Sequence, residues 1–235
     1  MSFLTLNKVT LHFATAHRPA LNQIDYEVQQ GDFVILLGSN GSGKSTLLKL
    51  LHESHQPNSG EIHFHAKSSA SQRIAVLTQN CSDSLFTSLT LYENYLLVKQ
   101  GPSKSHRAER TFLGKYLLGY NPNLAHKLDV LVEQLSGGER QAFALALCLL
   151  HPPALLLLDE HTSALDPRTS EQIMQLTQKM IIQHKMTCIL TTHDLEIALK
   201  YGNRILMLRE GEVYKEIDNS EKQALSKELL VQLYQ

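Results

Sequence analysis

One glycine-rich segment limits what this chain can fold into more than any other feature. It reads Gly38-Ser39-Asn40-Gly41-Ser42-Gly43-Lys44-Ser45-Thr46, and it lies between the apolar run Phe33–Leu37 and a helical pattern at about 46–51. A short apolar run predicts a buried strand, and a strand that turns through G-x-x-x-x-G-K-S into a helix predicts a phosphate-binding loop (P-loop) in an α/β fold. Glycines let successive backbone N–H groups point at phosphate oxygens, and the helix N-terminus adds positive potential. We therefore expect Lys44 to contact the β- and γ-phosphates of a nucleotide and the Ser45 hydroxyl to bind Mg²⁺.

A second chemical signal is a leucine run that ends in two carboxylates. Leu155–Leu158 predicts a buried parallel strand, and Asp159 and Glu160 follow at its carboxyl end, the edge where open α/β sheets bind ligands. Asp159 suits a Mg²⁺ partner, directly or through water, and Glu160 suits a base that polarises an attacking water. The alternative is a strand followed by a solvated acidic turn, which the P-loop upstream makes the weaker interpretation.

The strand and helix patterns predict a single domain with an insertion. Residues 1–80 and 151–235 carry buried strands alternating with helices, which predicts a mostly parallel sheet, and alternation in 3–6 and 9–13 predicts an antiparallel β edge. Residues 81–150 show helix signals and little strand, so we expect a helical subdomain there. The other predicted elements are strands at Tyr26–Val28, Glu61–His65, Ile74–Thr78, Thr187–Thr191 and Arg204–Leu208, and a helix at Pro167–His184.

Capping-box spacing marks three predicted helix starts, at Thr90-x-x-Glu93, Ser136-x-x-Glu139 and Ser220-x-x-Gln223. After the third of these, Leu225, Leu229 and Leu233 recur at helical spacing. They predict one apolar face of a final helix.

Charge and hydrophobicity limit the possible partners. The net charge of −1 provides no basic field for nucleic-acid phosphates, so we expect no nucleic-acid partner. The start of the chain lacks a secretory signal. The most apolar stretch, Ala142–Leu158, is interrupted by His151-Pro152-Pro153, which leaves two pieces too short to span a bilayer.

Cysteines and histidines give no metal pattern. Cys81, Cys148 and Cys188 lack C-x-x-C spacing and are interpreted as reduced thiols of a cytosolic protein. Histidines are paired at His52/His55 and His63/His65, but neither pair has a recognisable third ligand. We interpret them as ordinary polar residues.

A third motif indicates the family. Leu135-Ser136-Gly137-Gly138-Glu139 opens an apolar helix, and two glycines at a helix N-terminus form another anion site. One P-loop already serves one nucleotide, so a second phosphate site implies a second nucleotide or a second subunit. At this point the chain resembles the ATP-binding-cassette (ABC) ATPases, whose signature is L-S-G-G-Q or L-S-G-G-E. The resemblance covers nearly the whole chain, and the motifs occur in the family's order.

The resemblance implies roles for four further positions. Gln79 matches the glutamine that contacts Mg²⁺ and the attacking water, and Ser163-Ala164-Leu165-Asp166 matches the D-loop, which crosses a dimer interface. His193 matches the switch histidine that contacts the γ-phosphate. Phe13 lies where the family keeps an aromatic residue, usually tyrosine, that stacks on adenine.

Three classes of ABC ATPase are possible: the nucleotide-binding subunit of a membrane transporter, a soluble mechanical ATPase of translation or DNA repair, and a regulatory ATPase that binds only a soluble partner. Translation-type members resemble two fused cassettes with a basic linker, and chromosome or repair types carry a long coiled coil between the P-loop and the signature. This chain has one cassette, and residues 43–135 lack sustained heptads. We therefore expect the Mg-ATP-hydrolysing subunit of a bacterial membrane transporter. The alternative is a soluble non-transport ABC ATPase or an exporter subunit.

The same resemblance implies partners and a location. We expect a second ABC ATPase subunit, in a homodimer with two sandwiched ATP, and a transmembrane permease that binds through residues 80–91. An extracytoplasmic substrate-binding protein completes the expected system. The chain itself is expected to be cytoplasmic and peripheral to the inner face of the membrane.

One departure from the family pattern indicates a particular subgroup of transporter ATPases. Most cassettes carry D-E-P-T, whereas this chain has His161 in D-E-H-T-S-A-L-D-P, which restores a backbone N–H and adds a group that could titrate near neutral pH. With Tyr201-Gly202-Asn203-Arg204, this form is similar to a subgroup of bacterial importer ATPases for small organic solutes such as amino acids. Neutral drift at this position is the alternative.

Overall fold

The structure is a computed structural model that describes residues 1–14, 16–65, 74–80, 84–101 and 105–234. The chain forms two compact units. We call them the core unit (Met1–Val76, Pro153–Glu160 and Ile181–Gln235) and the helical unit (Leu77–Pro152 and His161–Met180). The helical unit therefore includes a segment after Glu160 that lies outside the helical subdomain expected at 81–150.

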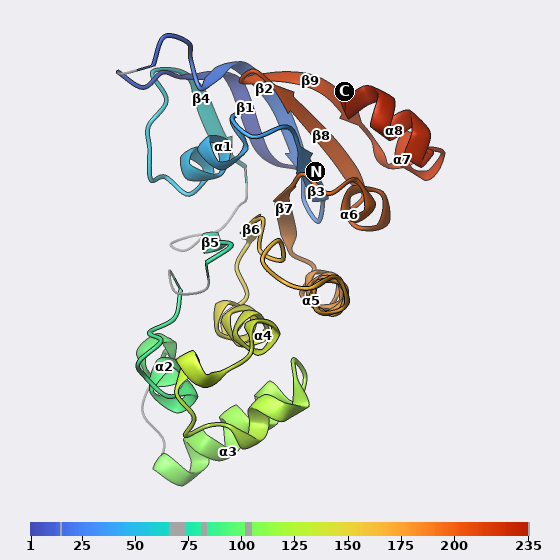
Figure 1. The fold of residues 1–235 in the computed structure, drawn as a ribbon. Helices are drawn as coiled ribbons and strands as arrows, with labels where there is room; N and C mark the ends of the chain where they lie inside the picture. Colours follow the sequence, from blue (N-terminus) through green and yellow to red (C-terminus); the bar gives the residue numbers. More distant parts are fainter. Residues whose placement is uncertain (15, 66–73, 81–83, 102–104, 235) are drawn as a thin grey trace. The chain divides into compact units, whose positions relative to one another are not determined.

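The core unit contains a six-stranded sheet whose middle strands are parallel (Figure 1). Its order is β5 (Ile74–Leu77), β6 (Leu155–Asp159), β7 (Thr187–Thr192), β3 (Phe33–Leu37), β8 (Arg204–Arg209) and β9 (Glu212–Ile217). β6, β7, β3 and β8 pair in parallel, and β9 adds antiparallel to β8. Every residue of β3 and β7 is buried, which is why β3 reads as a continuous apolar run and β7 carries only apolar residues and threonine. The predicted α/β fold with a mostly parallel sheet is confirmed.

A second, antiparallel sheet of three strands forms the predicted β edge. Its order is β2 (Leu21–Gln29), β1 (Ser2–Leu11) and β4 (Ser59–Phe64). Burial alternates along β2, as expected for a sheet with one face on a core. The two runs predicted at 3–6 and 9–13 are one strand, because a register shift between Leu6 and Val9 absorbs Lys8, whose φ is 46°.

The core of this unit lies between the two sheets and α1 (Lys44–Leu51). Aliphatic side chains from β1, β2, β3, β6 and β8 form one buried cluster with Leu47, Leu48, Leu50 and Leu51 of α1. Each buried leucine contributes roughly 1.5–3 kcal/mol to folding. This packing fixes α1 against the sheet and therefore holds the loop between β3 and α1.

The helical unit contains α2 (Leu91–Val98), α3 (His106–Leu117), α4 (Gly137–Cys148) and the first part of α5 (Pro167–His184). Two short 3-10 helices, η2 (Pro122–His126) and η3 (Val132–Gln134), connect α3 to α4. Both capping boxes predicted here are present, Thr90 with Glu93 and Ser136 with Glu139. No helix in the described ranges is long and apolar enough to cross a bilayer.

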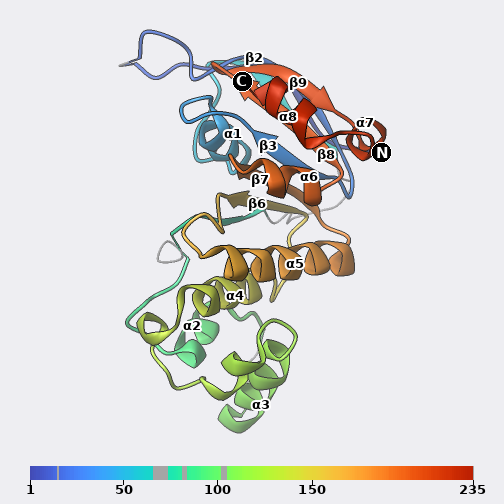
Figure 2. The ribbon, with the colours of Figure 1, turned by 45° about the vertical axis from the view of Figure 1, so that its right-hand side comes forward.

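The C-terminal helices differ from the prediction in two respects. The residue that caps α7 (Asn219–Gln223) is Asp218 rather than Ser220, because its carboxylate accepts hydrogen bonds from the N–H groups of Ser220 and Glu221. In α8 (Lys227–Tyr234) the buried leucine is Leu230, whereas Leu229 is 46% exposed. Figure 2 shows α8 beside α6 (Leu195–Lys200), and the ion pair of Lys227 with Glu196 (2.6 Å) joins the two helices.

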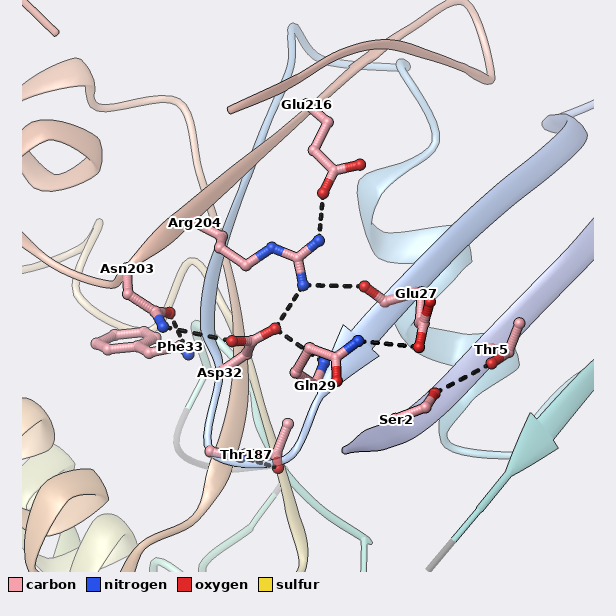
Figure 3. Close-up of polar contacts among 11 residues, drawn as sticks. Ser2, Thr5, Glu27, Gln29, Asp32, Phe33, Thr187, Asn203, Arg204 and Glu216 are labelled. Carbon is pink, nitrogen blue, oxygen red and sulfur yellow. Dashed lines mark hydrogen bonds and ion pairs between the residues drawn. The ribbon is translucent and has the colours of Figure 1, made fainter. Parts of the chain in front are cut away.

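A partly buried polar cluster joins the amino ends of β3 and β8 to the last residues of β9 (Figure 3). Arg204, at the start of β8, donates hydrogen bonds to Asp32 before β3 and to Glu216 on β9, and its guanidinium lies over the Tyr26 ring, 5.1 Å from the centroid. Asn203 adds a hydrogen bond from its Nδ2 to Asp32 Oδ1 (3.3 Å). The Arg204 and Asp32 side chains are 14% and 10% exposed, so this pair is largely shielded from water.

Removing this arginine should destabilise the core unit. We expect Arg204→Met to lower the free energy of unfolding by about 2 kcal/mol, because it leaves the buried Asp32 carboxylate without its cation, with a discount for partial exposure. The matched control is Arg18→Met, because the ion pair of Arg18 with Glu210 is 82% and 77% exposed and should change stability by less than about 0.5 kcal/mol. Urea denaturation measures both, and equal effects would contradict the structural role of the cluster.

Candidate functional site

The glycine-rich loop links the end of β3 to α1 and leaves space only for glycine at key positions. Gly43 has φ 104°, and a Cβ there would lie 2.7 Å from the Ala20 carbonyl oxygen. At Gly38 a Cβ would lie 2.3 Å from Ser42 Oγ and 2.6 Å from the Leu208 carbonyl oxygen. Side chains at these positions would distort the backbone, so the loop requires its glycines. The helix begins at Lys44, two residues earlier than expected.

Lys44 is 6% exposed and folds back over this loop. Its Nζ donates hydrogen bonds to the carbonyl oxygens of Gly38 (2.7 Å) and Ser39 (3.2 Å). Burial lowers the pKa of Lys44, and the charges of Glu160 and Asp159 partly oppose this effect. The ammonium group is therefore held at the mouth of the loop, next to two carboxylates.

The two predicted Mg²⁺ ligands of the core unit contact each other. Asp159 Oδ1, at the end of β6, accepts hydrogen bonds from Ser45 Oγ (3.2 Å) and from Thr191 Oγ1 (2.6 Å). A carboxylate and a hydroxyl are oxygen ligands of the kind that Mg²⁺ takes, and Mg²⁺ usually completes its shell with substrate phosphates and water rather than with a protein cage. The donor set therefore fits Mg²⁺ bound together with a phosphate.

Glu160 and His193 form the next pair along the same edge of the sheet. The Nδ1 of His193 lies 3.2 Å from Glu160 Oε1, and the two side chains are 56% and 22% exposed. Glu160 has a left-handed backbone, with φ 46°. Its N–H points to Thr191, 3.2 Å from the carbonyl oxygen and 3.1 Å from Oγ1. A strained backbone held by two acceptors fixes where this carboxylate points.

Thr191 was not singled out from the sequence as a site residue. It is fully buried and its hydroxyl lies between the Asp159 carboxylate and the Glu160 N–H. Its partner in the strand register is Asp159. Strand β7 contains three threonines, and only the pairing of β7 with β6 indicates that Thr191 is the one that contacts the acidic pair.

Phe13 follows β1 and is 37% exposed. Its ring meets the His55 ring edge-on, with centroids 5.7 Å apart and an interplanar angle of 86°. An edge-on neighbour leaves a ring face available, which is what stacking on a base requires. The role of Phe13 in binding adenine stays a prediction.

The predicted signature residues lie at the start of α4, in the helical unit. Ser136 caps the helix, with its Oγ accepting from the Glu139 N–H (3.3 Å), and Lys127 binds Glu139 (2.6 Å). Burial alone would raise the pKa of Glu139, but hydrogen bonds from Lys127 and Ser136 outweigh it and the pKa is lowered. Ser136, Gly138 and Glu139 line an open cavity of about 640 Å³.

The remaining predicted residues also belong to the helical unit. Gln79 follows β5 and is exposed. Asp166 precedes α5 and accepts a hydrogen bond from the Thr169 N–H (3.1 Å). The structure thus brings Lys44, Ser45, Asp159, Glu160 and His193 together in the core unit, while Gln79, Ser136–Gly138 and Asp166 lie in the other unit.

His161 does not titrate near neutral pH. Its side chain is 2% exposed, and burial lowers its pKa to about 4. Nε2 lies 3.2 Å from the hydroxyl oxygen of Thr177, which is fully buried on α5. The idea of a neutral-pH titrating group is therefore wrong, because at pH 7 the ring is neutral and packed inside the helical unit.

The other histidines and the cysteines carry no metal pattern in the described residues. No three His, Cys, Asp or Glu side chains gather there to hold an ion. His63 contacts Glu61 (2.8 Å) and His65 contacts Thr5 (2.7 Å). Cys148 is half-buried, Cys188 is buried, and Cys81 lies outside the described residues.

Comparisons with known proteins agree with this geometry. A family model described as ABC transporter matches residues 21–163. The chain is 35% identical over 224 residues to a tyrosine transport ATP-binding protein of Clostridioides difficile, covering 90% of this chain and 89% of the relative. It is 33% identical over 221 residues to the cell division ATP-binding protein FtsE of Mycobacterium tuberculosis, covering 91% and 95%. A dimeric ATP-binding cassette solved in a post-hydrolysis state with ADP and Pi matches with a TM-score of 0.74 at 28% identity, covering 92% of this chain and 98% of the other.

Proposed function

This chain belongs to the ABC transporter family of ATPases, and from that premise we propose that it drives a bacterial importer of a small solute such as an amino acid. ATP hydrolysis is the activity of the family. The observation that carries the proposal for this chain is the group formed by the P-loop, Asp159, Glu160 and His193 at one edge of the core sheet. This group brings together the glycine-rich loop, the two proposed Mg²⁺ ligands and the proposed base.

Each core residue has a task in this proposal. The P-loop N–H groups and Lys44 bind the β- and γ-phosphates. Mg²⁺, when bound at Ser45 and Asp159, would neutralise phosphate charge. Glu160 accepts the proton of the attacking water, and His193, which lies 3.2 Å from it, orients the carboxylate and contacts the γ-phosphate. Gln79 completes the set as a contact to Mg²⁺ and water, and Phe13 stacks on the adenine.

The signature residues serve a second subunit in this proposal. Ser136 and Gly138 of one protomer face the γ-phosphate on the P-loop of the other, and Asp166 lies at the same interface. The dimeric cassette with ADP and Pi, which this chain resembles, supports such an arrangement. Two ATP molecules would then be sandwiched in a homodimer.

Dimerisation should therefore require ATP. We expect Glu160→Gln protein to be monomeric without nucleotide and dimeric with Mg-ATP, because the phosphates join the P-loop of one subunit to the signature of the other. Light scattering after size exclusion measures the mass. The Lys44→Ala/Glu160→Gln variant is the control and should remain monomeric, and a strict monomer of Glu160→Gln with saturating Mg-ATP would argue against a homodimer.

The proposed permease surface is the segment 80–91, of which residues 81–83 lie outside the described residues. Phe86 is 63% exposed, while its backbone is fixed by hydrogen bonds with the buried Asn94 side chain, from the Phe86 N–H (2.9 Å) and to the Phe86 carbonyl (3.0 Å). Leu85 beside it is 4% exposed. A rigid backbone that presents an aromatic ring outward supports docking of a permease helix.

Crosslinking tests this surface. A cysteine at Phe86 should crosslink to cysteines in a cytoplasmic loop of the permease, whereas a cysteine at the buried Leu85 should not. The permease would hold the chain at the cytoplasmic face of the membrane. Failure of every exposed position from 84 to 89 to crosslink in an assembled transporter would place the contact elsewhere.

The substrate proposal rests on the D-E-H-T-S-A-L-D-P form and on the relative named for tyrosine transport. We expect a permease and an extracytoplasmic binding protein to complete the system. Uptake of labelled amino acids should fall in a deletion strain and return with wild-type protein but not with Lys44→Ala. The relative named for cell division favours the alternative, a non-transport role, in which uptake is unchanged and division fails. Unchanged uptake with loss of export of another compound would instead indicate an exporter subunit.

A further inference from the structure

The start of α4 packs closely against α5 and the loop before it, so a side chain at 138 would clash and a side chain at 137 would be tightly packed. A Cβ at Gly138 would lie 2.4 Å from Thr169 Cγ2, and the next heavy atom, Thr169 Cβ, would be 3.8 Å away. A Cβ at Gly137 would lie 3.1 Å from Leu165 Cδ2. All these residues belong to the helical unit, and Figure 2 shows α4 and α5 side by side there. The methyl group of Thr169 thus occupies the space of a side chain at 138.

Asp166 holds the backbone of Thr169 in place. The Thr169 N–H donates to Asp166 Oδ1 (3.1 Å) and fixes residue 169 at the start of α5. Threonine is β-branched, so its χ1 angle is restricted in a helix and few rotations are open to it. A clash at 138 therefore has few ways to be relieved at Thr169.

We propose that Thr169 is a positioning residue for the signature motif: bonded to Asp166, it sets through its methyl where Gly138 and the first turn of α4 lie. Leu165, against Gly137, provides a second contact of the same kind. Through these two contacts, the position of the D-loop sets the position of the signature motif. This inference rests on the proposed role of Ser136 and Gly138 at the partner's nucleotide.

The expected size of the effect follows from the distances. An ordinary contact of a Cβ begins near 3.4 Å, so an alanine at 138 requires a shift of roughly 1 Å between the first turn of α4 and the Thr169 methyl. Misplacement of a catalytic contact by about 1 Å can lower turnover about 10²-fold. Gly138 does not have a left-handed backbone, so alanine is compatible with its helical conformation.

The test adds a methyl group at position 138 and removes one at position 169. We expect Gly138→Ala to lower kcat for ATP about 10²-fold with the KM for ATP nearly unchanged, because the P-loop of the same subunit is intact. Thr169→Ser alone removes the methyl that positions the first turn of α4, so it should also lower kcat, by roughly 10-fold, with the KM for ATP nearly unchanged. The combined Gly138→Ala/Thr169→Ser protein should recover kcat at least about 10-fold over Gly138→Ala.

A matched variant keeps the test specific. Thr169→Val retains the methyl branch and deletes the hydroxyl, so Gly138→Ala/Thr169→Val should stay as slow as Gly138→Ala. ATP binding and thermal melting of each protein separate misfolding from a kcat defect. The inference is overturned if Gly138→Ala is fully active, or if Thr169→Ser fails to rescue folded Gly138→Ala protein that binds ATP, which would indicate that a side chain at 138 blocks the phosphate itself. A wild-type chain without Lys44-dependent hydrolysis would instead refute the proposed function.

Discussion

Glu160→Gln protein should hydrolyse ATP about 10²-fold more slowly than wild type, or slower still, while it binds ATP with unchanged affinity. Glutamine keeps the size of the side chain and its hydrogen bond with His193, but it cannot accept a proton from water. Steady-state phosphate release measures turnover, and equilibrium titration with a fluorescent ATP analogue measures binding.

The same substitution at an exposed glutamate outside the site is the control for this experiment. Glu61→Gln changes an exposed glutamate on β4 by the same chemistry and should leave turnover unchanged. Because His193 Nδ1 and Glu160 Oε1 are 3.2 Å apart, the effects of Glu160→Gln and His193→Ala should not add. Wild-type turnover in Glu160→Gln would remove this carboxylate from the role of base.

Lys44→Ala protein should lose about 10²-fold in ATP affinity, and turnover at low ATP should fall with it. The structure places the Lys44 ammonium 2.7 Å from the Gly38 carbonyl at the mouth of the loop. A charged hydrogen bond is worth about 1.5–3 kcal/mol, and in the proposed ATP complex this largely buried ammonium would pair with phosphate oxygens. Isothermal titration with ATP in the presence of Mg²⁺ measures the loss.

The control for this substitution lies on the same helix. Lys49 is an exposed lysine of α1, so Lys49→Ala removes an equal charge without touching the loop. Its ATP affinity should stay within about 2-fold of wild type, because exposed charges are strongly screened. Equal losses in the two variants would mean that net charge rather than the Lys44 contact controls binding.

Local patterns predicted the elements that have clear physical boundaries. The bounds of β6 and α5 agree with the sequence prediction, because acidic residues end the leucine run and Pro167 opens the helix. At α7 two capping boxes overlap, Asp218 with Glu221 and Ser220 with Gln223. The ionised carboxylate of Asp218 is the stronger acceptor and forms the cap, whereas the spacing rule selected Ser220.

The features that were missed depend on contacts between distant segments. Thr191 joins Asp159 and Glu160 only through the register of β7 on β6. Burial of His161 against Thr177 is likewise tertiary, and without it a histidine beside the proposed catalytic carboxylate suggests a group that titrates near neutral pH. The roles of Gln79, Phe13 and the signature residues stay predictions, since they concern nucleotide and partner contacts.

The Arg204 cluster has a consequence for the genetics of such a chain. It joins the amino ends of β3 and β8, whereas the P-loop begins at the carboxyl end of β3, a strand's length of roughly 15 Å away. Substitutions at Arg204 should therefore reduce the amount of folded protein in a cell without changing the turnover of each molecule that folds. A strain carrying such an allele would be rescued by higher expression or lower growth temperature, whereas an allele at Glu160 would not be. The response to expression level thus distinguishes substitutions that lower the amount of folded protein from substitutions that lower the turnover of each molecule.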